Sequence, residues 1–359
     1  MNEMSKKATS DRTRRRGKVN VDKVTLAHGA GGKAMRDLID DAFLDAFGEP
    51  DDGVLEDQAR LLMSDLSAQG DRLALTTDSF VVDPLFFPGG NIGTLAVAGT
   101  VNDLAVSGAK PLYLTCGMII EEGLPVETLR RVARSMQETA EKAGVRIITG
   151  DTKVVHHGAA DKLFINTAGI GVIPEGLDIS SANAKPGDVV IVNGVLGDHG
   201  AAILNARGDL ALEADIESDC GPLNGLIDAI INICPEVRSI RDATRGGIAS
   251  VLNEVAEDSR VGVLLNEQSI PMRAEVTGVC EILGLDPLYL ANEGKIVVVV
   301  PGDMSDAVLQ AMRTHEDGQD SVVIGKICEA PAGTVVMETL FGGRRVVDML
   351  VGEQLPRIC

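Results

Sequence analysis

The chain has 359 residues, of which 45% are hydrophobic and only 3% aromatic, with no Trp and a formal net charge of −20. This length suits two domains with cores of ordinary size, while the charge and the scarce aromatics argue against binding to nucleic acid or to an anionic membrane. The sequence lacks an apolar run long enough for a signal peptide or a transmembrane helix, so we expect a cytoplasmic protein.

The first 20 residues carry seven Lys or Arg against two Asp or Glu. A short, strongly basic segment cannot bury enough apolar surface to fold, so we predict a disordered extension over residues 1–20. An electrostatic contact with an acidic partner is the alternative interpretation.

Residues 21–173 are predicted to form a first domain in which helices and strands are mixed. The clearest helix covers residues 125–143: Pro125 falls in its first turn, apolar residues recur at helical spacing, and Gly144 ends it. Further helices are expected at 35–47 and, because its small residues allow close packing, at 91–107. Strands are expected at 73–77, 112–120, 145–149 and 163–173.

Residues 174–187 read as a linker, because two Pro and two Gly lie among polar residues there. A second domain is predicted over residues 188–348. Its strands are expected at 188–192, 261–265, 296–300, 322–327 and 335–340, and its helices at 199–206, 223–233, 246–257 and 274–283. Helices mixed with strands on both sides of a linker predict two α/β units, followed by a mobile tail at 349–359.

Two segments have the composition of phosphate-binding loops. The first, HGAGGK at residues 28–33, has three glycines and ends on Lys33, but Ala27 and Ala34 depart from the Walker A pattern. The second, DATRGG at residues 242–247, places Arg245 and two glycines at the start of a predicted helix. A tight structural turn and a capped helix start are the respective alternatives.

Four acidic residues lie at or near the ends of apolar stretches: Asp57, Asp78, Asp103 and Asp151. Strand ends can bring such carboxylates into one cleft, where they repel one another unless a cation neutralises them. Mg²⁺ bound to nucleotide phosphates would do so. Each Asp taken singly reads as a helix cap or a turn residue.

The last residue of the chain is Cys359, one of six cysteines that include no C-x-x-C pair, so a structural zinc site is not expected. Ten extended residues span roughly 30–35 Å, so a terminal thiol could swing into a cleft of the body like a carrier arm. An incidental terminal cysteine is the alternative. Upstream, Glu293 is interpreted either as an exposed ion pair with Lys295 or as a general base.

These features together resemble the HypE family of hydrogenase expression/formation proteins, within the PurM-like ATP-binding superfamily. The terminal PRIC at 356–359 is the most specific mark, and the resemblance covers nearly the whole chain from about Val24. The other matching stretches are HGAGGKAM (28–35), TTDSFVVDPLFFPGGNIGTLAVAGTVNDLAVSGAKP (76–111), GDTKVV (150–155), GDHG (197–200), RDATRGGIASVLNEVA (241–256) and DPLYLANEGK (286–295).

The resemblance implies an ATP-dependent carbamoyl dehydratase. Its members receive a carbamoyl group on the terminal cysteine from the carbamoyltransferase HypF, and they dehydrate it to a thiocyanate with ATP. They then pass cyanide to iron on a HypC–HypD complex for [NiFe]-hydrogenase. The implied fold pairs two N-terminal domains into a β-barrel across a homodimer and adds a C-terminal α/β domain.

The role assignments are hypotheses that rest on these motif matches. The resemblance implies Cys359 as substrate carrier, Glu293 as base and Lys153 as the side chain that stabilises negative charge on the thiocarboxamide. Arg357 would steer the tail toward the acidic body. Mg²⁺ would be held by Asp57, Asp78, Asp103 and Asp151. The implied nucleotide-binding residues are Gly29, Gly31, Gly32, Lys33, Asp78, Asn102, Asp103, Gly150, Asp151, Thr152, Arg245 and Gly246.

Two other classes of function compete with this interpretation. A selenophosphate synthetase or an aminoimidazole ribonucleotide synthetase-like enzyme would share the ATP site, but the former uses a Cys or selenocysteine near the N-terminus, and this chain has none before Cys116. A non-catalytic scaffold for metallocentre assembly would use Cys359 only to dock a partner.

Overall fold

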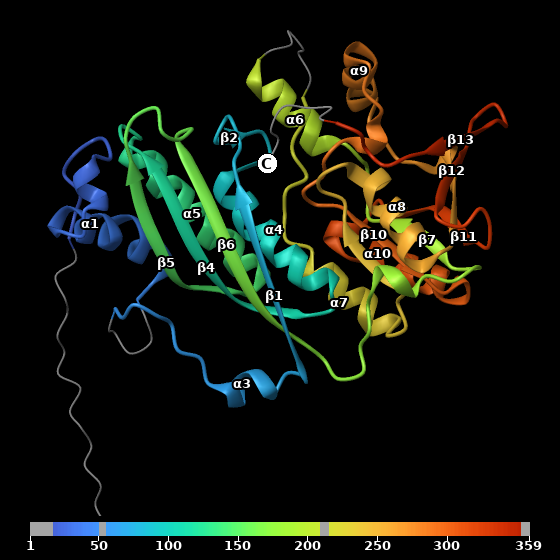
Figure 1. Ribbon diagram of the computed structural model, residues 1–359, viewed down its shortest axis with the longest axis horizontal. Helices are drawn as coiled ribbons and strands as arrows, with labels where there is room; N and C mark the ends of the chain where they lie inside the picture. The colour runs from blue at the N-terminus through green and yellow to red at the C-terminus, as the bar shows by residue number, and fades with distance from the viewer. Residues whose placement is uncertain (1–16, 50–54, 209–214, 353–359) are drawn as a thin grey trace, which may run out of the picture.

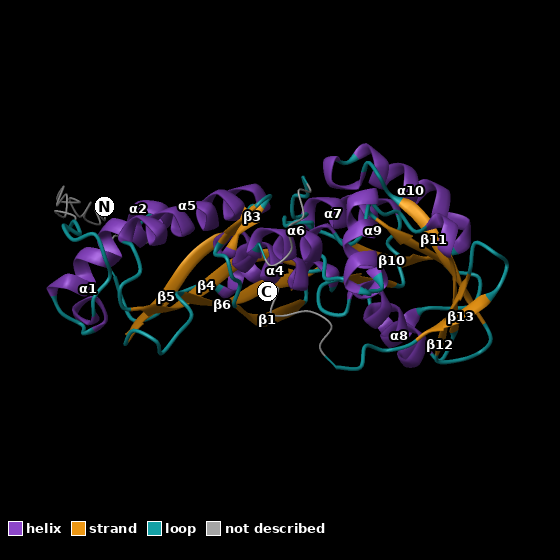
Figure 2. Cartoon of the chain, turned by 90° about the horizontal axis from the view of Figure 1, so that it is seen from above, coloured by secondary structure: helices purple, strands orange, loops and turns teal. Residues whose placement is uncertain are grey.

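The computed structural model describes residues 17–49, 55–208 and 215–352, arranged as two mixed α/β domains side by side (Figures 1 and 2). Each domain is built around its own sheet, of four strands in the first and seven in the second. Within the described residues, no helix is both long and apolar enough to cross a membrane. The predicted extension at 1–20 lies largely outside the described residues, as do the last seven residues of the predicted tail.

The first sheet has the strand order β1-β6-β4-β5. Its strands are β1 (Arg72–Phe80), β4 (Lys110–Glu121), β5 (Arg146–Val155) and β6 (Leu163–Ile173). Strand β6 pairs antiparallel with both β1 and β4, whereas β4 and β5 run parallel, so β1 and β5 are the two edges.

Helices α4 (Ile92–Val106) and α5 (Val126–Ala143) cover one face of this sheet and leave the other open (Figure 2). The sequence explains both helices. The Asn91 side chain caps α4 by accepting from Gly93 N–H at 2.8 Å, and Gly144 ends α5 in the left-handed conformation. Close packing of α4 is also confirmed, because a Cβ on Gly99 would lie 2.9 Å from the Phe80 ring.

A helical segment precedes the first sheet and lies beside its β5 edge (Figure 1). It begins with η1 (Leu26–Gly29) and continues through α1 (Lys33–Leu38), a π-helical turn η2 (Ile39–Phe43) and α2 (Leu44–Phe47). This run confirms the helix predicted at 35–47. The short elements α3 (Met63–Ser67), β2 (Phe86–Phe87) and β3 (Gly90–Asn91) complete the domain.

The second sheet has the order β13-β12-β9-β11-β7-β10-β8, antiparallel except between β12 and β9. Its strands are β7 (Val189–Val192), β8 (Ser239–Asp242), β9 (Gly262–Asn266), β10 (Ile296–Val300), β11 (Val322–Cys328), β12 (Thr334–Glu338) and β13 (Arg344–Val347). The helices are α6 (Asp198–Arg207), α7 (Asn224–Ile233), α8 (Gly247–Ser259), α9 (Ala274–Leu283) and α10 (Ser305–Thr314). Short turns are η3 (Ser181–Asn183), η4 (Glu267–Ser269), η5 (Pro287–Tyr289), η6 (Gly302–Met304) and η7 (Glu316–Gly318).

Helices on both faces bury the centre of this sheet, which explains the uninterrupted apolar run of β10. Val297 and Val299 pack in the core that includes α8, whereas Ile296, Val298 and Val300 pack in the core that includes α7 and α10. All five side chains are buried.

Helix α4 contributes to the cores of both domains. Its first three turns pack in the first core, while Ala105 and Val106 at its end pack with Ile227 and Ile230 of α7 in the second. The domains are therefore joined by a shared helix as well as by the segment 174–187, within which η3 lies.

The structure corrects the expected placement of the acidic residues. Asp78 lies inside β1 and Asp151 inside β5, because both strands continue beyond the predicted ends, and Asp103 lies inside α4. Their relative positions consequently depend on the sheet order and on the face toward which each side chain points, and not on a shared row of strand ends.

Candidate functional site

Three carboxylates gather where the two domains meet: Asp78 from β1, Asp103 from α4 and Asp242 from the end of β8. Asp103 accepts a hydrogen bond from Thr76 Oγ1 at 2.9 Å. Burial, together with the charges of Asp242 and Asp78, raises the pKa of Asp103 to about 6, and burial also raises the pKa of Asp242. Mutual repulsion of this kind is what a bound cation would relieve.

Arg245 is the cationic side chain beside this acid cluster. Its guanidinium lies 3.3 Å from an Asp78 carboxylate oxygen, and its side chain is 71% exposed. The next two residues, Gly246 and Gly247, have φ of +73° and +58°. A Cβ at Gly247 would also approach Leu288 O to 2.4 Å, so the chain can turn into α8 here only with glycine. The turn leaves Arg245 at the open start of a 13-residue helix.

Glu293 is a buried carboxyl group close to the acid cluster, with only 4% of its surface exposed. Burial raises its pKa well above the usual value, and the charges of Asp219, Asp242 and Asp78 add to the effect while Arg245 opposes it. An exposed Glu293–Lys295 ion pair, one of the two sequence interpretations, is wrong: Lys295 lies 3.0 Å from Asp219 instead.

Asp57, Asp151 and Lys153 lie apart from this cluster. Asp78 of β1 pairs with Thr167 of β6, which pairs with Cys116 of β4, and Cys116 pairs with Gly150 of β5. Asp151, next to Gly150, is therefore three strand spacings from Asp78, about 14 Å. Alternation along β5 also turns Asp151 and Lys153 to the open face, opposite α4, and both are exposed. Asp57 is also exposed, and its neighbours Glu56 and Gln58 line a cavity beside β5, away from the acid cluster. One chain therefore does not bring the four predicted acids together.

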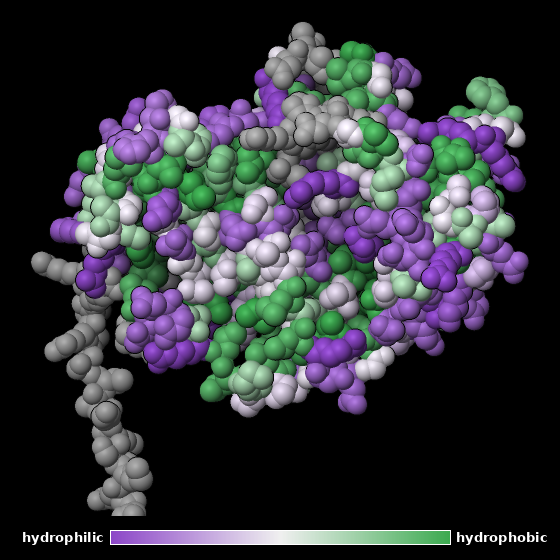
Figure 3. Space-filling model, in the orientation of Figure 1, coloured by the Kyte–Doolittle hydropathy of each residue, from purple (hydrophilic) through white to green (hydrophobic). Residues whose placement is uncertain are grey.

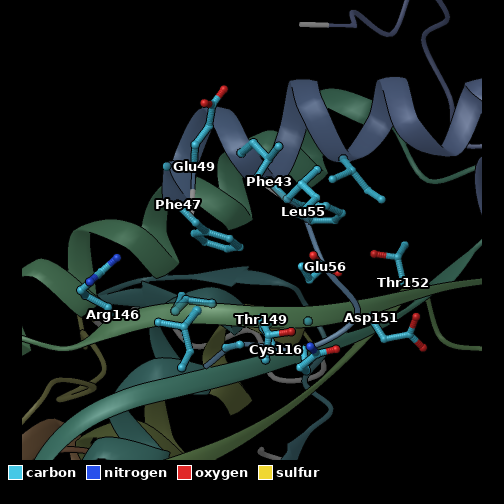
Figure 4. Close-up of a pocket in the computed structure, with 18 of the residues that line it drawn as sticks. Phe43, Phe47, Glu49, Leu55, Glu56, Cys116, Arg146, Thr149, Asp151 and Thr152 are labelled. Atoms are coloured by element: carbon cyan, nitrogen blue, oxygen red, sulfur yellow. The ribbon is translucent and has the colours of Figure 1, made fainter. Parts of the chain in front are cut away.

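A cavity of about 450 Å³ lies between β5 and the helical segment at its edge (Figure 4). Phe43, Phe47 and Leu55 line it from one side, and Thr149, Asp151 and Thr152 from the other. Mostly apolar walls with a few polar groups suit a small organic ligand such as a nucleotide base. Gly150 also lines it, where a Cβ would approach Cys116 O to 2.2 Å.

The glycine-rich segment packs beside β5. A Cβ on Gly29 would lie 2.8 Å from Val154 N, so this glycine allows close approach to the strand. Gly31 has φ of +78° and Gly32 precedes α1. Lys33 is 86% exposed and pairs with Asp37 at 2.5 Å. Its contact with phosphate stays a prediction.

Asn102, Arg357 and Cys359 are the remaining residues to which the sequence assigned a role. Asn102 is buried, and both ends of its amide bond the backbone of residues 221 and 223, at 3.1 and 2.7 Å, so its nucleotide-binding role stays a prediction. Cys359 and Arg357 lie outside the described residues.

Asp242, Asp219 and His199 are residues that sequence reasoning did not assign to the site. Strand β8, which positions Asp242, has only four residues and was not predicted. His199 is buried, lies 2.8 Å from Ser218 Oγ and packs edge-on against Phe87. The signals for His199 were its place after Asp198 and the family-like stretch GDHG at 197–200, and no role was assigned to it.

Carboxylates are the ligands that Mg²⁺ prefers, so the donor types of the acid cluster fit this ion. Among the described residues, however, no three Asp, Glu, His or Cys side chains are close enough to hold a metal ion as they stand. Bound Mg²⁺ would have to draw these carboxylates together.

Comparisons with known proteins find matches over nearly the whole chain. The family models described as AIR synthase related protein, N-terminal and C-terminal domain, match residues 52–173 and 185–338. The chain is 57% identical over 338 residues to the carbamoyl dehydratase HypE of Rhodobacter capsulatus, covering 94% of this chain and 98% of that one.

Two solved structures are similar in both sequence and fold. The crystal structure of the hydrogenase maturation protein HypE in complex with ATP has a TM-score of 0.88 and 47% identity, covering 93% of this chain and 99% of that one. A HypE–HypF complex contains a chain with a TM-score of 0.75 and 50% identity, covering 77% of this chain and 90% of that one.

Proposed function

Because the chain belongs to the HypE family of carbamoyl dehydratases, with a mixed α/β, PurM-like two-domain fold, we propose that it acts in hydrogenase maturation on its own C-terminal Cys359. The reaction is the ATP-dependent dehydration of an S-carbamoyl group to a thiocyanate. The thiocyanate then supplies the cyanide ligand of the iron in [NiFe]-hydrogenase.

The observation that carries this proposal is the buried Glu293 carboxyl group at the edge of the acid cluster. An amide oxygen is a poor leaving group, so it must first be phosphorylated: the oxygen attacks the γ-phosphate of ATP, ADP departs, and one N–H proton is lost. Removal of the second N–H proton then expels phosphate and completes the C≡N bond. Burial and neighbouring charges raise the pKa of Glu293, which makes its ionised form a stronger acceptor for these protons.

Phosphates of ATP suit the boundary between the domains. Arg245 and the N-terminus of α8 offer positive charge there, and Asp78, Asp103 and Asp242 are the carboxylates that would hold Mg²⁺. Bound Mg²⁺ would neutralise charge on the phosphates. The adenine base of ATP would occupy the cavity beside β5, whose lining includes the predicted residues Gly150, Asp151 and Thr152.

A homodimer is the second part of the proposal. The open face of the first sheet exposes Leu73, Leu75 and Ile119, at 49%, 73% and 43%, and Figure 3 shows apolar surface over the lower part of this sheet. Exposed apolar area of this kind favours burial against a second copy. Lys153 aligns with Ile119 on the same face, so it would reach the interface, where Asp151 also points.

HypF is the proposed source of the carbamoyl group, because a HypE–HypF complex is among the similar structures. A HypC–HypD complex is the proposed acceptor of cyanide. Both partners would meet the tail that carries Cys359.

The experiment that tests the function measures the mass of the whole protein before and after ATP is added. Intact-protein mass spectrometry of the HypF-carbamoylated chain should show loss of one water when ATP and Mg²⁺ are added. Glu293→Gln should bind ATP as the wild type does and keep the carbamoyl mass. If the wild type shows no mass loss, or if a Cys359→Ala chain still supplies cyanide, the proposal fails in favour of a scaffold.

A further inference from the structure

Residues 218–223, here called the strap, link the first domain to the residues around Glu293. Ser218 N–H donates to Pro88 O at 2.8 Å. Asn102 of α4 donates to Gly221 O at 3.1 Å and accepts from Leu223 N–H at 2.7 Å. The strap is thus attached to the helix that carries Asp103.

Asp219 is the strap residue that contacts the turn at Glu293. Its Oδ1 accepts the Glu293 N–H at 3.0 Å, and its Oδ2 lies 3.0 Å from Lys295 Nζ. The side chain is 4% exposed. Burial alone would raise the pKa of Asp219, but Lys295 and His199 outweigh burial and hold it below the usual value. A buried anion is therefore fixed against the backbone of the proposed base.

The turn itself is shaped for this contact. A Cβ on Gly294 would lie 1.8 Å from Asp219 O, so only glycine lets the strap approach. Asn193 donates to Gly294 O at 3.1 Å and accepts from Ile296 N–H at 2.8 Å, which fixes the far side of the turn. The Glu293 N–H is left to Asp219.

We propose that Asp219 is a positioning residue for Glu293: from a strap attached to α4, its carboxylate holds the Glu293 backbone so that the Glu293 carboxyl group faces the acid cluster. The inference rests on the proposed role of Glu293 as base. Asp219 itself touches neither the nucleotide nor the carbamoyl group.

Two double variants isolate the hydrogen bond from the ion pair. Asp219→Asn with Lys295→Met removes both charges but keeps an oxygen for the Glu293 N–H, whereas Asp219→Ala with Lys295→Met removes the oxygen too. With saturating ATP, we expect the Ala variant to lose about 100-fold in dehydration rate and the Asn variant to stay within about threefold of the wild type, because a misplacement of about 1 Å costs that much. Both should bind ATP as the wild type does.

Asp188→Ala is the control for stability. Asp188 is also a buried aspartate of the second domain, 3.5 Å from Arg238, at the end of β7 remote from Asn193. Its loss should lower the melting temperature without a change in dehydration rate.

Hydrogen exchange at the Glu293 amide provides a readout that does not depend on catalysis. We expect exchange to be faster in the Ala double variant than in the Asn double variant. Equal exchange, or equal dehydration rates in a chain whose wild type makes thiocyanate, would overturn the inference. If the wild type makes no thiocyanate, the proposed function is refuted instead. The difference in exchange between the two double variants would still test whether Asp219 holds the Glu293 amide.

Discussion

Replacing Asp103 with Asn tests the electrostatics of the acid cluster most directly. The pKa of Asp103 rises from 3.8 to about 6 on folding, because the side chain is buried next to Asp242 and Asp78. The unfolded chain therefore releases this proton at lower pH than the folded chain does. The contribution of Asp103 to the stability of the folded wild type therefore falls as pH rises from about 4 to above 6.

The size of the effect follows from the shift. About two pKa units correspond to about 3 kcal/mol, which is an upper limit because the side chain is partly exposed to solvent. Asp103→Asn removes this cost and keeps an oxygen that can accept from Thr76. At pH 8 we expect the variant to be more stable than the wild type by about 1–3 kcal/mol, and at pH 4 to be equal to it.

Urea unfolding in EDTA at pH 4, 6 and 8 measures the difference. Asp22→Asn, at an exposed position, is the control and should follow the wild type at every pH. Magnesium and ATP should then stabilise the wild type but not Asp103→Asn. The reasoning is refuted if the variant is no more stable than the wild type at pH 8, or if its advantage is the same at pH 4.

Further predictions concern single positions. Gly247→Ala should destabilise the chain by about 2 kcal/mol or more, because φ is +58° and Leu288 O blocks the Cβ. Gly284 has φ of +67° but open space around it, so Gly284→Ala should cost about 1 kcal/mol. Thermal unfolding compares the two variants. Asn102→Ala should slow dehydration, because its amide bonds the strap. Titration calorimetry tests its predicted nucleotide role: an unchanged affinity for ATP would limit Asn102 to holding the strap, and a weaker affinity would support contact with the nucleotide. Leu75→Glu should convert a dimer to a monomer in sedimentation experiments, whereas Leu340→Glu, at an exposed position on the second domain, should not. An unchanged dimer would place the interface elsewhere.

The elements of the fold could be predicted where the local pattern was strong. Helices α5 and α9 and strands β6 and β10 follow the expected ranges within a residue, because apolar spacing, Gly stops and β-branched runs all favour one structure there. Strands β8 and β13, of four residues each, and helix α10 were missed. The two strands are too short to carry a periodic signal, and tertiary pairing decides them. Helix α10 has ten residues and buries Val308 and Met312 at helical spacing, so its pattern was present in the sequence and was overlooked.

The site could be predicted only in its residue types. The sequence identified Asp78, Asp103, Arg245 and Glu293, but it could not separate Asp151 from them, because that separation depends on strand order and on which face of β5 a side chain occupies. Asp219 escaped for the same reason, and Asp242 was noted only as the first residue of the DATRGG segment, without a role of its own. Each owes its role to a neighbour more than 70 residues away.

Helix α4 limits how the two domains can move. Ile92 and Leu95 at one end of the helix are buried in the first core, and Ala105 and Val106 at the other end are buried in the second. A hinge motion that opened the boundary would therefore pull one end of the helix out of its core. We therefore expect the two domains to move as one body, so that the acid cluster at their boundary keeps its shape.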